Sequence, residues 1–282
     1  MFTPDLLQHK RILITGGGTG LGRAMAERFL SLGATVYICG RRAAVLDQTR
    51  AELAATGGER IQAIPCDVRD PAQVEAMLDA IWRDGPLNVL VNNAAGNILA
   101  RTEELSARAW DAVLGIVLTG TINCTMACGR RWLAASQPAN VLNISTSYAT
   151  SGSGSAYVVP SAVAKAGVMA LTTSLAVEWG PRGIRMNGIA PGPVPTEGAF
   201  SRLLPRADLE QHALHKNPLR RFGTTEELAN LATFLVSDIC TYINGEIVVM
   251  DGGEWLQGAG EFSDIGNMLT EEDWAAMRPK KK

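Results

Sequence analysis

Seven short runs rich in β-branched and other apolar residues alternate along this chain with segments whose apolar residues recur at helical spacing. The runs are RILIT (11–15), TVYIC (35–39), IQAIPC (61–66), NVLVNN (88–93), NVLNIS (140–145), IRMNGIA (184–190) and EIVVM (246–250). Strands that are apolar on consecutive residues are buried on both faces, and right-handed crossovers between them form a doubly wound sheet. The pattern therefore predicts an α/β fold with a seven-stranded parallel sheet between two layers of helices.

The alternation covers most of the chain without a Pro/Ser-rich linker or an internal repeat, so we expect a single domain over residues 1–282. The stretch 195–224, with mixed Pro, Arg and Leu, interrupts the alternation and is predicted to form a lid over the carboxyl edge of the sheet. Residues 258–282 are expected to form a C-terminal extension. Ligands of such sheets bind outside the carboxyl ends of the strands, so functional residues should follow each run directly.

Composition argues against several function classes. The 26 Lys and Arg residues against 28 Asp and Glu residues give a formal net charge of −2, which provides no basic field for a nucleic acid. No apolar run approaches the roughly 18 residues that a membrane span requires, and the first residues lack the features of a signal or transit peptide. Five cysteines without a C-x-x-C pair indicate a reducing compartment and no metal site. We therefore expect a cytoplasmic protein without a nucleic-acid or membrane partner.

A glycine-rich turn, TGGGTGLG at 15–22, follows the first run and leads directly into a helical pattern. Strand, glycine turn and helix in this order let the backbone approach a pyrophosphate, and the helix N-terminus offers free N–H groups to the anion. The arrangement predicts a dinucleotide site of the Rossmann type, and the alternative is a glycine turn without a ligand. The residues predicted to contact the nucleotide in this turn are Gly16, Gly18, Thr19, Gly20, Leu21 and Gly22.

Two arginines, Arg41 and Arg42, follow the second run, where an NAD-specific site usually has an acidic residue for the ribose 2′-hydroxyl. Guanidinium groups form bidentate bonds to a 2′-phosphate, so we predict NADPH as the cofactor. The alternative is that both are solvated residues at the start of a helix. Asp67, after the third run, is predicted to accept a hydrogen bond from the adenine amino group, with a helix N-cap as its alternative.

Three motifs together resemble the short-chain dehydrogenase/reductase family over nearly the whole chain: the T-G-x-x-x-G-x-G turn, NNAAG at 92–96 and the Pro-Gly pair at 191–192. The resemblance implies that the cofactor is also contacted by Asn93, Ala94, Pro191, Gly192 and Val194. The family's common catalytic element is a Tyr four residues before a Lys on one helix, with a Ser at the end of strand five. Lys165 matches, but the residue four before it is Ser161, which lacks the acidity of a phenol. Either another residue is the acid or the chain is inactive.

Longer segments resemble the 2,4-dienoyl-CoA reductases of that family, which are NADPH-dependent enzymes of unsaturated fatty-acid β-oxidation. These segments are NNAAGN, VVPSAVAKAG, PGPVPTEGAFSR, GTTEELANLATFL, ING and DGGEW. In the mitochondrial-type members a Ser precedes the Lys by four residues and the working Tyr comes just after strand five, where this chain has Tyr148. The loop from Tyr148 to Lys165 is two residues longer than in those relatives. It holds a second tyrosine, Tyr157, in place of an aromatic residue without a hydroxyl.

The resemblance implies an acyl-CoA substrate and a catalytic set of Tyr148, Lys165 and Ser161. Hydride addition at the far end of a conjugated dienoyl thioester moves charge onto the thioester oxygen, which needs a hydrogen-bond donor such as a phenol. Lys165 shares a helix face with Ser161 and is expected to bind the nicotinamide ribose as well. Coenzyme A carries phosphates, so arginines are expected at the site of an acyl-CoA substrate. The resemblance implies that this substrate is contacted by Arg41, Arg69, Ser106 and Arg202.

Two other functions stay open on the sequence alone. A carbonyl or enoyl reductase of another substrate would use Tyr157 as its acid, and an NADPH-binding scaffold without turnover would use neither tyrosine. Thr119 replaces the Asn that completes the family's common tetrad, and Asp251 is a candidate proton donor through water or a turn residue. The resemblance also implies a homotetramer formed through the long helices after strands four and five.

Overall fold

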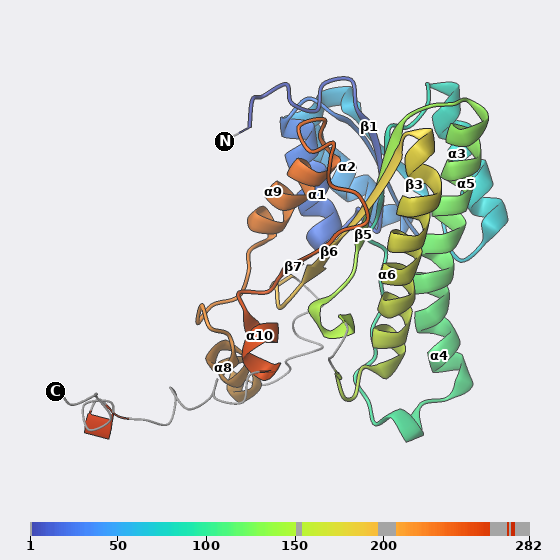
Figure 1. Cartoon of the computed structure of the whole chain (residues 1–282). Helices are drawn as coiled ribbons and strands as arrows, with labels where there is room; N and C mark the ends of the chain where they lie inside the picture. The colour runs from blue at the N-terminus through green and yellow to red at the C-terminus, as the bar shows by residue number, and fades with distance from the viewer. Residues whose placement is uncertain (1, 151–153, 197–206, 260–269, 271, 274–282) are drawn as a thin grey trace.

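The computed structural model describes residues 2–150, 154–196, 207–259, 270 and 272–273, and within them one parallel sheet organises the chain (Figure 1). Its strand order is β3-β2-β1-β4-β5-β6-β7. The strands are β1 (Arg11–Thr15), β2 (Thr35–Gly40), β3 (Ile61–Pro65), β4 (Val89–Asn92), β5 (Ala139–Ile144), β6 (Ile184–Pro191) and β7 (Ile247–Met250). Every neighbouring pair runs parallel, which confirms the predicted doubly wound α/β fold.

Helices cover both faces of the sheet (Figure 1). One face carries α1 (Gly20–Ser31), α2 (Ala43–Gly57) and α9 (Thr225–Val236), whose buried side chains share a core cluster with β1 and β2. The other face carries α3 (Pro71–Arg83), α5 (Gly120–Ala134) and α6 (Val159–Trp179). A short helix α4 (Ala107–Leu114) joins α5 through a π-helical turn, Gly115–Thr119. Each layer buries its apolar stripe against the sheet, which is the arrangement that the alternating pattern requires.

The strand order reverses between β1 and β4, and this reversal defines where a ligand can bind. Ile14 of β1 is in register with Val91 of β4, and Asn92 of β4 is in register with Asn143 of β5. The carboxyl ends of β1, β4 and β5 therefore lie side by side. The glycine turn, the NNAAG segment and Tyr148 all leave the sheet from this one edge.

A buried polar chain ties helix α6 to the middle of the sheet. The Asn92 side-chain amide donates to Asn143 Oδ1 at 2.9 Å, and the Asn143 amide donates to Thr172 Oγ1 of α6 at 2.8 Å. Asn143 and Thr172 are completely buried, so each of these bonds lies in a medium where an unpaired polar group is costly. These hydrogen bonds fix the position of α6 along β5. They thereby fix the position of the side chains at the start of the helix.

The predicted lid and C-terminal extension are only partly within the described residues. Of the stretch 195–224, residues 207–216 form helix α8 (Ala207–Lys216), and residues 197–206 lie outside the described residues. Helix α9 begins after Thr224, whose hydroxyl and backbone form a capping box with Glu227. Helix α10 (Glu254–Ala259) opens the C-terminal extension.

Two helical stretches of the described chain, Ala107–Ala134 and Val159–Arg182, are long and apolar enough to cross a membrane by length and composition. About half of the most apolar window of each, 50% and 44%, is buried inside the protein. The second stretch also contains Lys165, which is buried near the sheet edge. Packing of these helices on the sheet accounts for their apolar sequence.

The five cysteines are free thiols and all are buried. Burial raises the pKa of Cys39 and Cys124, which keeps these thiols protonated and unreactive at neutral pH. Among the described side chains, no group of three His, Cys, Asp or Glu residues could hold a metal ion.

Candidate active site

Tyr148 and Ser161 meet at the carboxyl end of β5. Tyr148 lies on a 3-10 turn, Ser147–Ala149, that follows β5 directly, and Ser161 lies in the first turn of α6. Their two hydroxyl oxygens are 2.9 Å apart, a hydrogen bond in which either group can be the donor. Ser161 is 2% exposed, whereas Tyr148 is half-buried. The contact therefore links a buried hydroxyl to a phenol that a ligand can reach.

Lys165 lies one helical turn after Ser161 and is buried beneath it. Its Nζ donates to the backbone oxygen of Ile144, the last residue of β5. Burial away from water lowers the pKa of Lys165 from 10.5 to about 8. The ammonium is thus still charged at neutral pH, and it supplies a positive charge inside a site with little water.

Asn97 is a third residue of this cluster, and sequence reasoning did not assign it a role. Its side-chain nitrogen donates to the Tyr148 hydroxyl at 3.3 Å, and its side-chain oxygen accepts from the backbone N–H of Ile98 at 2.8 Å. The NNAAGN segment contains this residue, and its place just after β4 was the available signal. The sequence did not indicate that the loops after β4 and β5 lie close together.

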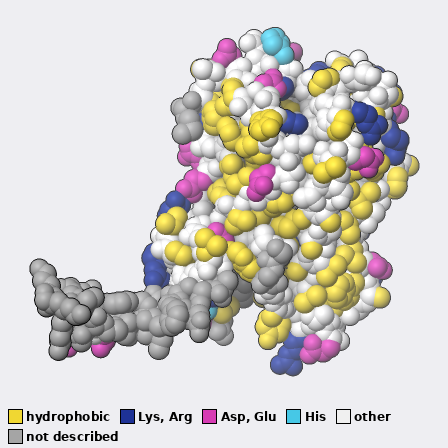
Figure 2. Space-filling view, in the orientation of Figure 1, with side chains coloured by type: hydrophobic (Ala, Val, Ile, Leu, Met, Phe, Trp, Pro, Cys, Tyr) yellow, Lys and Arg dark blue, Asp and Glu magenta, His cyan; other side chains and the backbone are white. Residues whose placement is uncertain are grey.

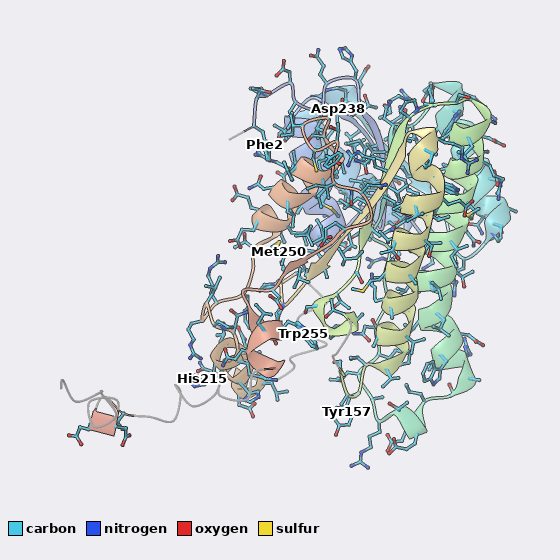
Figure 3. The ribbon with its side chains drawn as sticks, viewed as in Figure 1. Phe2, Tyr157, His215, Asp238, Met250 and Trp255 are labelled. Atoms are coloured by element: carbon cyan, nitrogen blue, oxygen red, sulfur yellow. The ribbon has the colours of Figure 1, made fainter. Side chains whose placement is uncertain are left out.

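Tyr157 lies away from this cluster. Its side chain is 57% exposed, its backbone has a φ of +67°, and its carbonyl accepts from the backbone N–H of Ala100 at 3.0 Å. Figure 3 shows it beyond the start of α6, at the lower edge of the view. The structure thus brings Tyr148 to Ser161 and places Tyr157 at the solvent-exposed rim.

The glycine turn is tightly packed, and its geometry fits a dinucleotide. Gly16 has a φ of +65°, and a Cβ on Gly22 would lie 2.4 Å from the Gly16 oxygen and 2.6 Å from Asn93 Nδ2. The hydroxyl of Thr15 accepts from the backbone N–H groups of Asn93 and Ala94, at 3.0 and 2.9 Å, and so joins the two loops. Thr19, the N-cap of α1, makes no side-chain cap. The first N–H groups of this helix are therefore free of side-chain capping and available to an anion.

Arg41 and Arg42 follow β2 and are both exposed at the same edge of the sheet. Arg42 occupies the N-cap position of α2 without making a side-chain cap, so its guanidinium is not committed to the helix. Arg41 is close enough to Asp67 for its charge to favour the ionised carboxylate. Positive charge therefore gathers where the ribose of a nucleotide bound at the glycine turn would lie.

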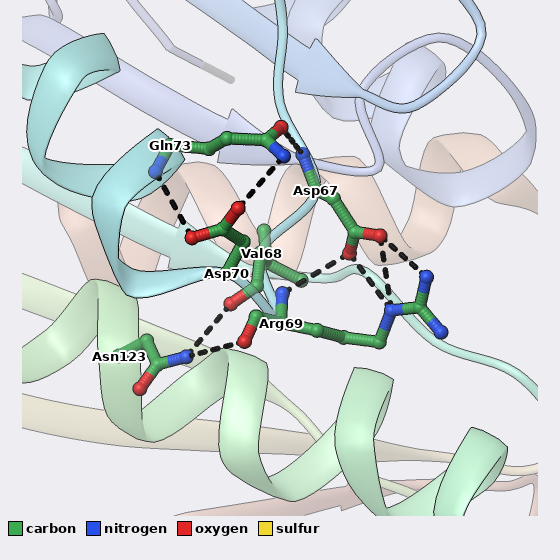
Figure 4. Close-up of polar contacts among 6 residues, drawn as sticks. All are labelled: Asp67, Val68, Arg69, Asp70, Gln73 and Asn123. Atoms are coloured by element: carbon green, nitrogen blue, oxygen red, sulfur yellow. Dashed lines mark hydrogen bonds and ion pairs between the residues drawn. The ribbon is translucent and has the colours of Figure 1, made fainter.

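Asp67 and Arg69 form an ion pair (Figure 4). Arg69 Nε donates to Asp67 Oδ1 at 2.9 Å, and hydrogen bonds from Arg69 hold the pKa of Asp67 below its usual range. The helix cap considered for Asp67 is instead supplied by Asp70, whose carboxylate accepts from the backbone N–H groups of Ala72 and Gln73. Asp67 is left beside the nucleotide edge, because three residues separate it from the start of α3.

The sequence comparisons agree with this geometry. A family model described as enoyl-(acyl carrier protein) reductase matches residues 16–254, a span that contains the glycine turn, Tyr148 and Lys165. The chain belongs to the short-chain dehydrogenase/reductase family. As a member of that family it is an oxidoreductase.

Curated relatives of this short-chain dehydrogenase/reductase cover most of its length. A Caenorhabditis elegans protein named as an uncharacterized oxidoreductase is 44% identical over 96% of this chain and 86% of the relative. A Bacillus subtilis protein named "Probable 2,4-dienoyl-CoA reductase [(2E)-enoyl-CoA-producing]" is 43% identical over 89% of this chain and 98% of the relative. A Danio rerio protein named as a peroxisomal, (3E)-enoyl-CoA-producing 2,4-dienoyl-CoA reductase is 36% identical over 93% and 86% of the two chains.

Solved structures of the family are also similar to this chain. A short-chain dehydrogenase from Bacillus anthracis superposes with a TM-score of 0.79 at 39% identity, covering 87% of this chain and 96% of that one. A dehydrogenase from Agrobacterium tumefaciens with bound NADP superposes with a TM-score of 0.81 at 34% identity, covering 90% and 99%. The second structure is evidence that this fold accepts a phosphorylated nicotinamide cofactor.

Other residues predicted for this short-chain dehydrogenase/reductase are placed as follows. Ser106 is the exposed N-cap of α4, and its hydroxyl accepts a hydrogen bond from the Ala109 N–H at 3.3 Å. The hydroxyl is therefore partly engaged in capping the helix. Both carboxylate oxygens of Asp251 accept hydrogen bonds from backbone N–H groups of the following turn. Asp251 therefore acts as the turn residue, and its carboxylate is not a free proton donor. Arg202 lies outside the described residues.

The segment after β6 borders a separate cavity. Pro191 ends β6, the Gly192 N–H donates to the Met250 carbonyl at 3.0 Å, and Val194 is half-buried beyond it. A cavity of about 450 Å³ is lined by Pro193, by Trp255 and by other residues of the β7–α10 region. Neither Tyr148 nor Lys165 lines it, so this cavity is distinct from the cluster of side chains at the β5 edge.

Proposed function

We propose that this protein catalyses the NADPH-dependent reduction of 2,4-dienoyl-CoA to enoyl-CoA in the β-oxidation of unsaturated fatty acids. The observation that carries the proposal is the 2.9 Å contact between Tyr148 and Ser161, with Lys165 buried one turn below. A phenol at this position replaces the phenol that the family usually has four residues before its lysine. The names of the relatives at 36–43% identity support the same substrate class.

The reaction adds one hydride and one proton to the conjugated thioester and converts NADPH to NADP⁺. The cofactor supplies the hydride when bound. Hydride addition at the distal carbon of the diene shifts an electron pair toward the thioester oxygen, and the Tyr148 hydroxyl donates a hydrogen bond to that oxygen. The proton then adds to carbon, which leaves one double bond in the product.

Lys165 and Ser161 prepare the phenol for this role. The ammonium of Lys165 favours negative charge nearby, and its low exposure limits screening by water. Ser161, fixed by the start of α6, holds the phenol oxygen toward the β5 edge. Because Lys165 bonds the carbonyl of Ile144, the helix and the strand end keep one relative position.

The cofactor site is proposed to combine the glycine turn with the residues after β2 and β3. Arg41 and Arg42 would bind the 2′-phosphate of NADPH, and Asp67 would accept from the adenine amino group. Lys165 would also hold the nicotinamide ribose. The acyl-CoA substrate would meet Arg41, Arg69 and Ser106, and Arg202 is proposed as a further contact for it.

The test is turnover. Purified protein should oxidise NADPH with 2,4-hexadienoyl-CoA or a longer 2,4-dienoyl-CoA, and oxidation of NADH should be much slower. Analysis of the product by nuclear magnetic resonance reports where the remaining double bond lies, a point on which the names of the relatives differ. Absence of turnover across chain lengths, with NADPH still bound, would contradict the proposal and favour a binding protein.

We also propose a cytoplasmic homotetramer. Figure 2 shows hydrophobic side chains gathered over the side of the molecule that carries α6. Ile122 of α5 and Val163 and Val177 of α6 are 37%, 48% and 79% exposed, and a contiguous patch of exposed apolar side chains marks an interaction surface. Light scattering coupled to size-exclusion chromatography should give four chains per particle, and a monomer would contradict this assembly.

A further inference from the structure

The turn between β3 and α3 is held by a side chain of helix α5 (Figure 4). The side-chain nitrogen of Asn123 donates to the carbonyl of Val68 at 3.0 Å and to the carbonyl of Arg69 at 3.4 Å. An amide nitrogen carries two protons, so one side chain can serve both carbonyls. Asn123 is half-buried and Val68 is 6% exposed, which limits competition from water. The backbone of Arg69 is therefore tied to a neighbouring helix.

Two glycines allow the same helical segment to approach the turn closely. A Cβ on Gly120 would lie 2.5 Å from Val68 Cγ2, a distance that real side chains do not show, so this contact requires a glycine. A Cβ on Gly115, in the π-helical turn, would lie 3.4 Å from Arg69 Cδ. The stem of the arginine thus packs against Gly115 while its carbonyl is bound by Asn123.

Asp67 holds Arg69 from the other side. Its Oδ1 accepts from the backbone N–H of Arg69 at 3.1 Å and from Arg69 Nε at 2.9 Å. The Arg69 side chain is nevertheless 41% exposed, so an anion in solution can reach the guanidinium. In Figure 4 the side chains of Asp67 and Arg69 extend away from Asn123. The turn therefore presents a guanidinium in a fixed place, and a guanidinium in a fixed place favours a phosphate.

We propose that Asn123 is a positioning residue for Arg69, and that it determines the affinity for the phosphates of coenzyme A without touching the substrate itself. The inference rests on the proposed function in one respect, since it takes an acyl-CoA as the ligand of Arg69. Asn123 binds the two carbonyls of the turn, the turn fixes the origin of the arginine side chain, and the guanidinium meets the phosphate.

A purely structural role for Asn123 makes a different prediction. If the side chain only stabilised the fold, its loss would weaken the binding of every ligand and lower the stability in parallel. A positioning role acts through Arg69. Its effect should therefore disappear when Arg69 is absent, and also when the substrate carries no phosphate.

The first measurement is calorimetric titration of the full chain, saturated with NADP⁺, with coenzyme A. Asn123→Ala should raise the Kd for coenzyme A about fivefold to tenfold, the equivalent of one hydrogen bond of ordinary strength. In the Arg69→Ala background the same change should alter the Kd by less than about twofold. Thermal unfolding of each variant identifies any loss of affinity that comes from misfolding.

Gln137→Ala is the matched control for this titration. Gln137 is also a half-buried amide that donates to a backbone carbonyl, that of Leu87 at 2.7 Å, but it lies near the amino end of β4, at the opposite edge of the sheet. Its loss should leave the Kd for coenzyme A unchanged. An equal rise of the Kd in Gln137→Ala and Asn123→Ala would identify a general loosening of the protein and overturn the inference.

The second measurement compares two substrates with the same thioester. In Asn123→Ala the KM for 2,4-hexadienoyl-CoA should rise about fivefold to tenfold, with kcat within about twofold of the wild type. The KM for 2,4-hexadienoyl-pantetheine, which has no phosphate, should not change. A rise of KM for both substrates, or a loss of affinity for coenzyme A that persists without Arg69, would overturn the role of Asn123. If the wild type binds coenzyme A but reduces neither substrate, the proposed function fails and the titrations alone decide the inference. A wild type that binds no coenzyme A would overturn the inference directly.

Discussion

The hydroxyl of Tyr148 lies 2.9 Å from that of Ser161, although the two residues are 13 positions apart and belong to different elements. One follows strand β5 and the other opens helix α6. Lys165 binds the last carbonyl of β5 and, together with the buried bond from Asn143 to Thr172, holds the start of the helix against the strand end.

Replacing each tyrosine in turn tests which one serves the reaction. Tyr148→Phe should lower kcat by about 10²- to 10⁴-fold, the usual contribution of a positioned proton donor, because it removes the hydroxyl next to Ser161. Tyr157→Phe should change kcat by less than about twofold, since that side chain is 57% exposed at the rim. Steady-state rates of NADPH oxidation provide the comparison. The reverse order would identify Tyr157 as the acid.

The buried lysine should make stability depend on pH in a defined direction. The pKa of Lys165 is about 8 in the folded protein and 10.5 without burial, so below pH 8 both states hold the proton and the full cost of burying the charge is present. Between these values the unfolded chain binds more protons than the folded one. The free energy of unfolding should therefore rise with pH, by up to about 3 kcal/mol over this window.

Lys165→Met is the matched variant for this measurement. The free energy of unfolding is measured with urea, without cofactor, at a pH below 8 and at a pH near 10.5. The rise due to Lys165 should be present in the wild type and absent from the variant. Taking the difference between the two proteins removes the opposite effect of the buried thiols, which are present in both. A difference that stays constant with pH would mean that Lys165 is not desolvated in solution.

The arginines after β2 should determine the choice between NADPH and NADH. Arg41→Ala combined with Arg42→Ala should weaken NADPH binding by about 10- to 100-fold, the range expected for lost hydrogen bonds to a charged phosphate. NADH lacks that phosphate and should bind as before. Fluorescence titration with both cofactors measures the ratio. An equal loss for the two would assign the arginines to general nucleotide binding or to folding.

The glycine turn should not tolerate a methyl group at position 22. In Gly22→Ala the new Cβ would lie 2.4 Å from the Gly16 oxygen, so either the turn or the Asn93 side chain must move. We expect a loss of about 1–3 kcal/mol in the free energy of unfolding and weaker binding of NADPH. Gly154→Ala is the control, because nothing lies within 4 Å of its Cβ position. Chemical denaturation and cofactor titration of both variants should separate them, and equal behaviour would argue against a tightly packed turn.

Much of the fold followed from local pattern. Runs such as RILIT and TVYIC are apolar on consecutive residues, so burial on both faces and parallel pairing were predictable, and β1 and β2 pair in that way. The helix cap before α3 depends on local turn geometry. Asp67 and Asp70 are both acidic residues near Pro71, and only the turn geometry shows that Asp70 caps the helix while Asp67 pairs with Arg69.

The site shows where local pattern is not sufficient. Sequence alone determined the sheet, the glycine turn and the replacement of the usual tyrosine by Ser161, because these depend on residue type and short-range spacing. Only the tertiary structure decided that Tyr148 rather than Tyr157 meets Ser161, and that Asn97 donates a hydrogen bond to Tyr148. The reason is that β4, β5 and α6 bring three loops to one edge of the sheet, and contacts between loops depend on strand register and helix packing rather than on distance along the chain.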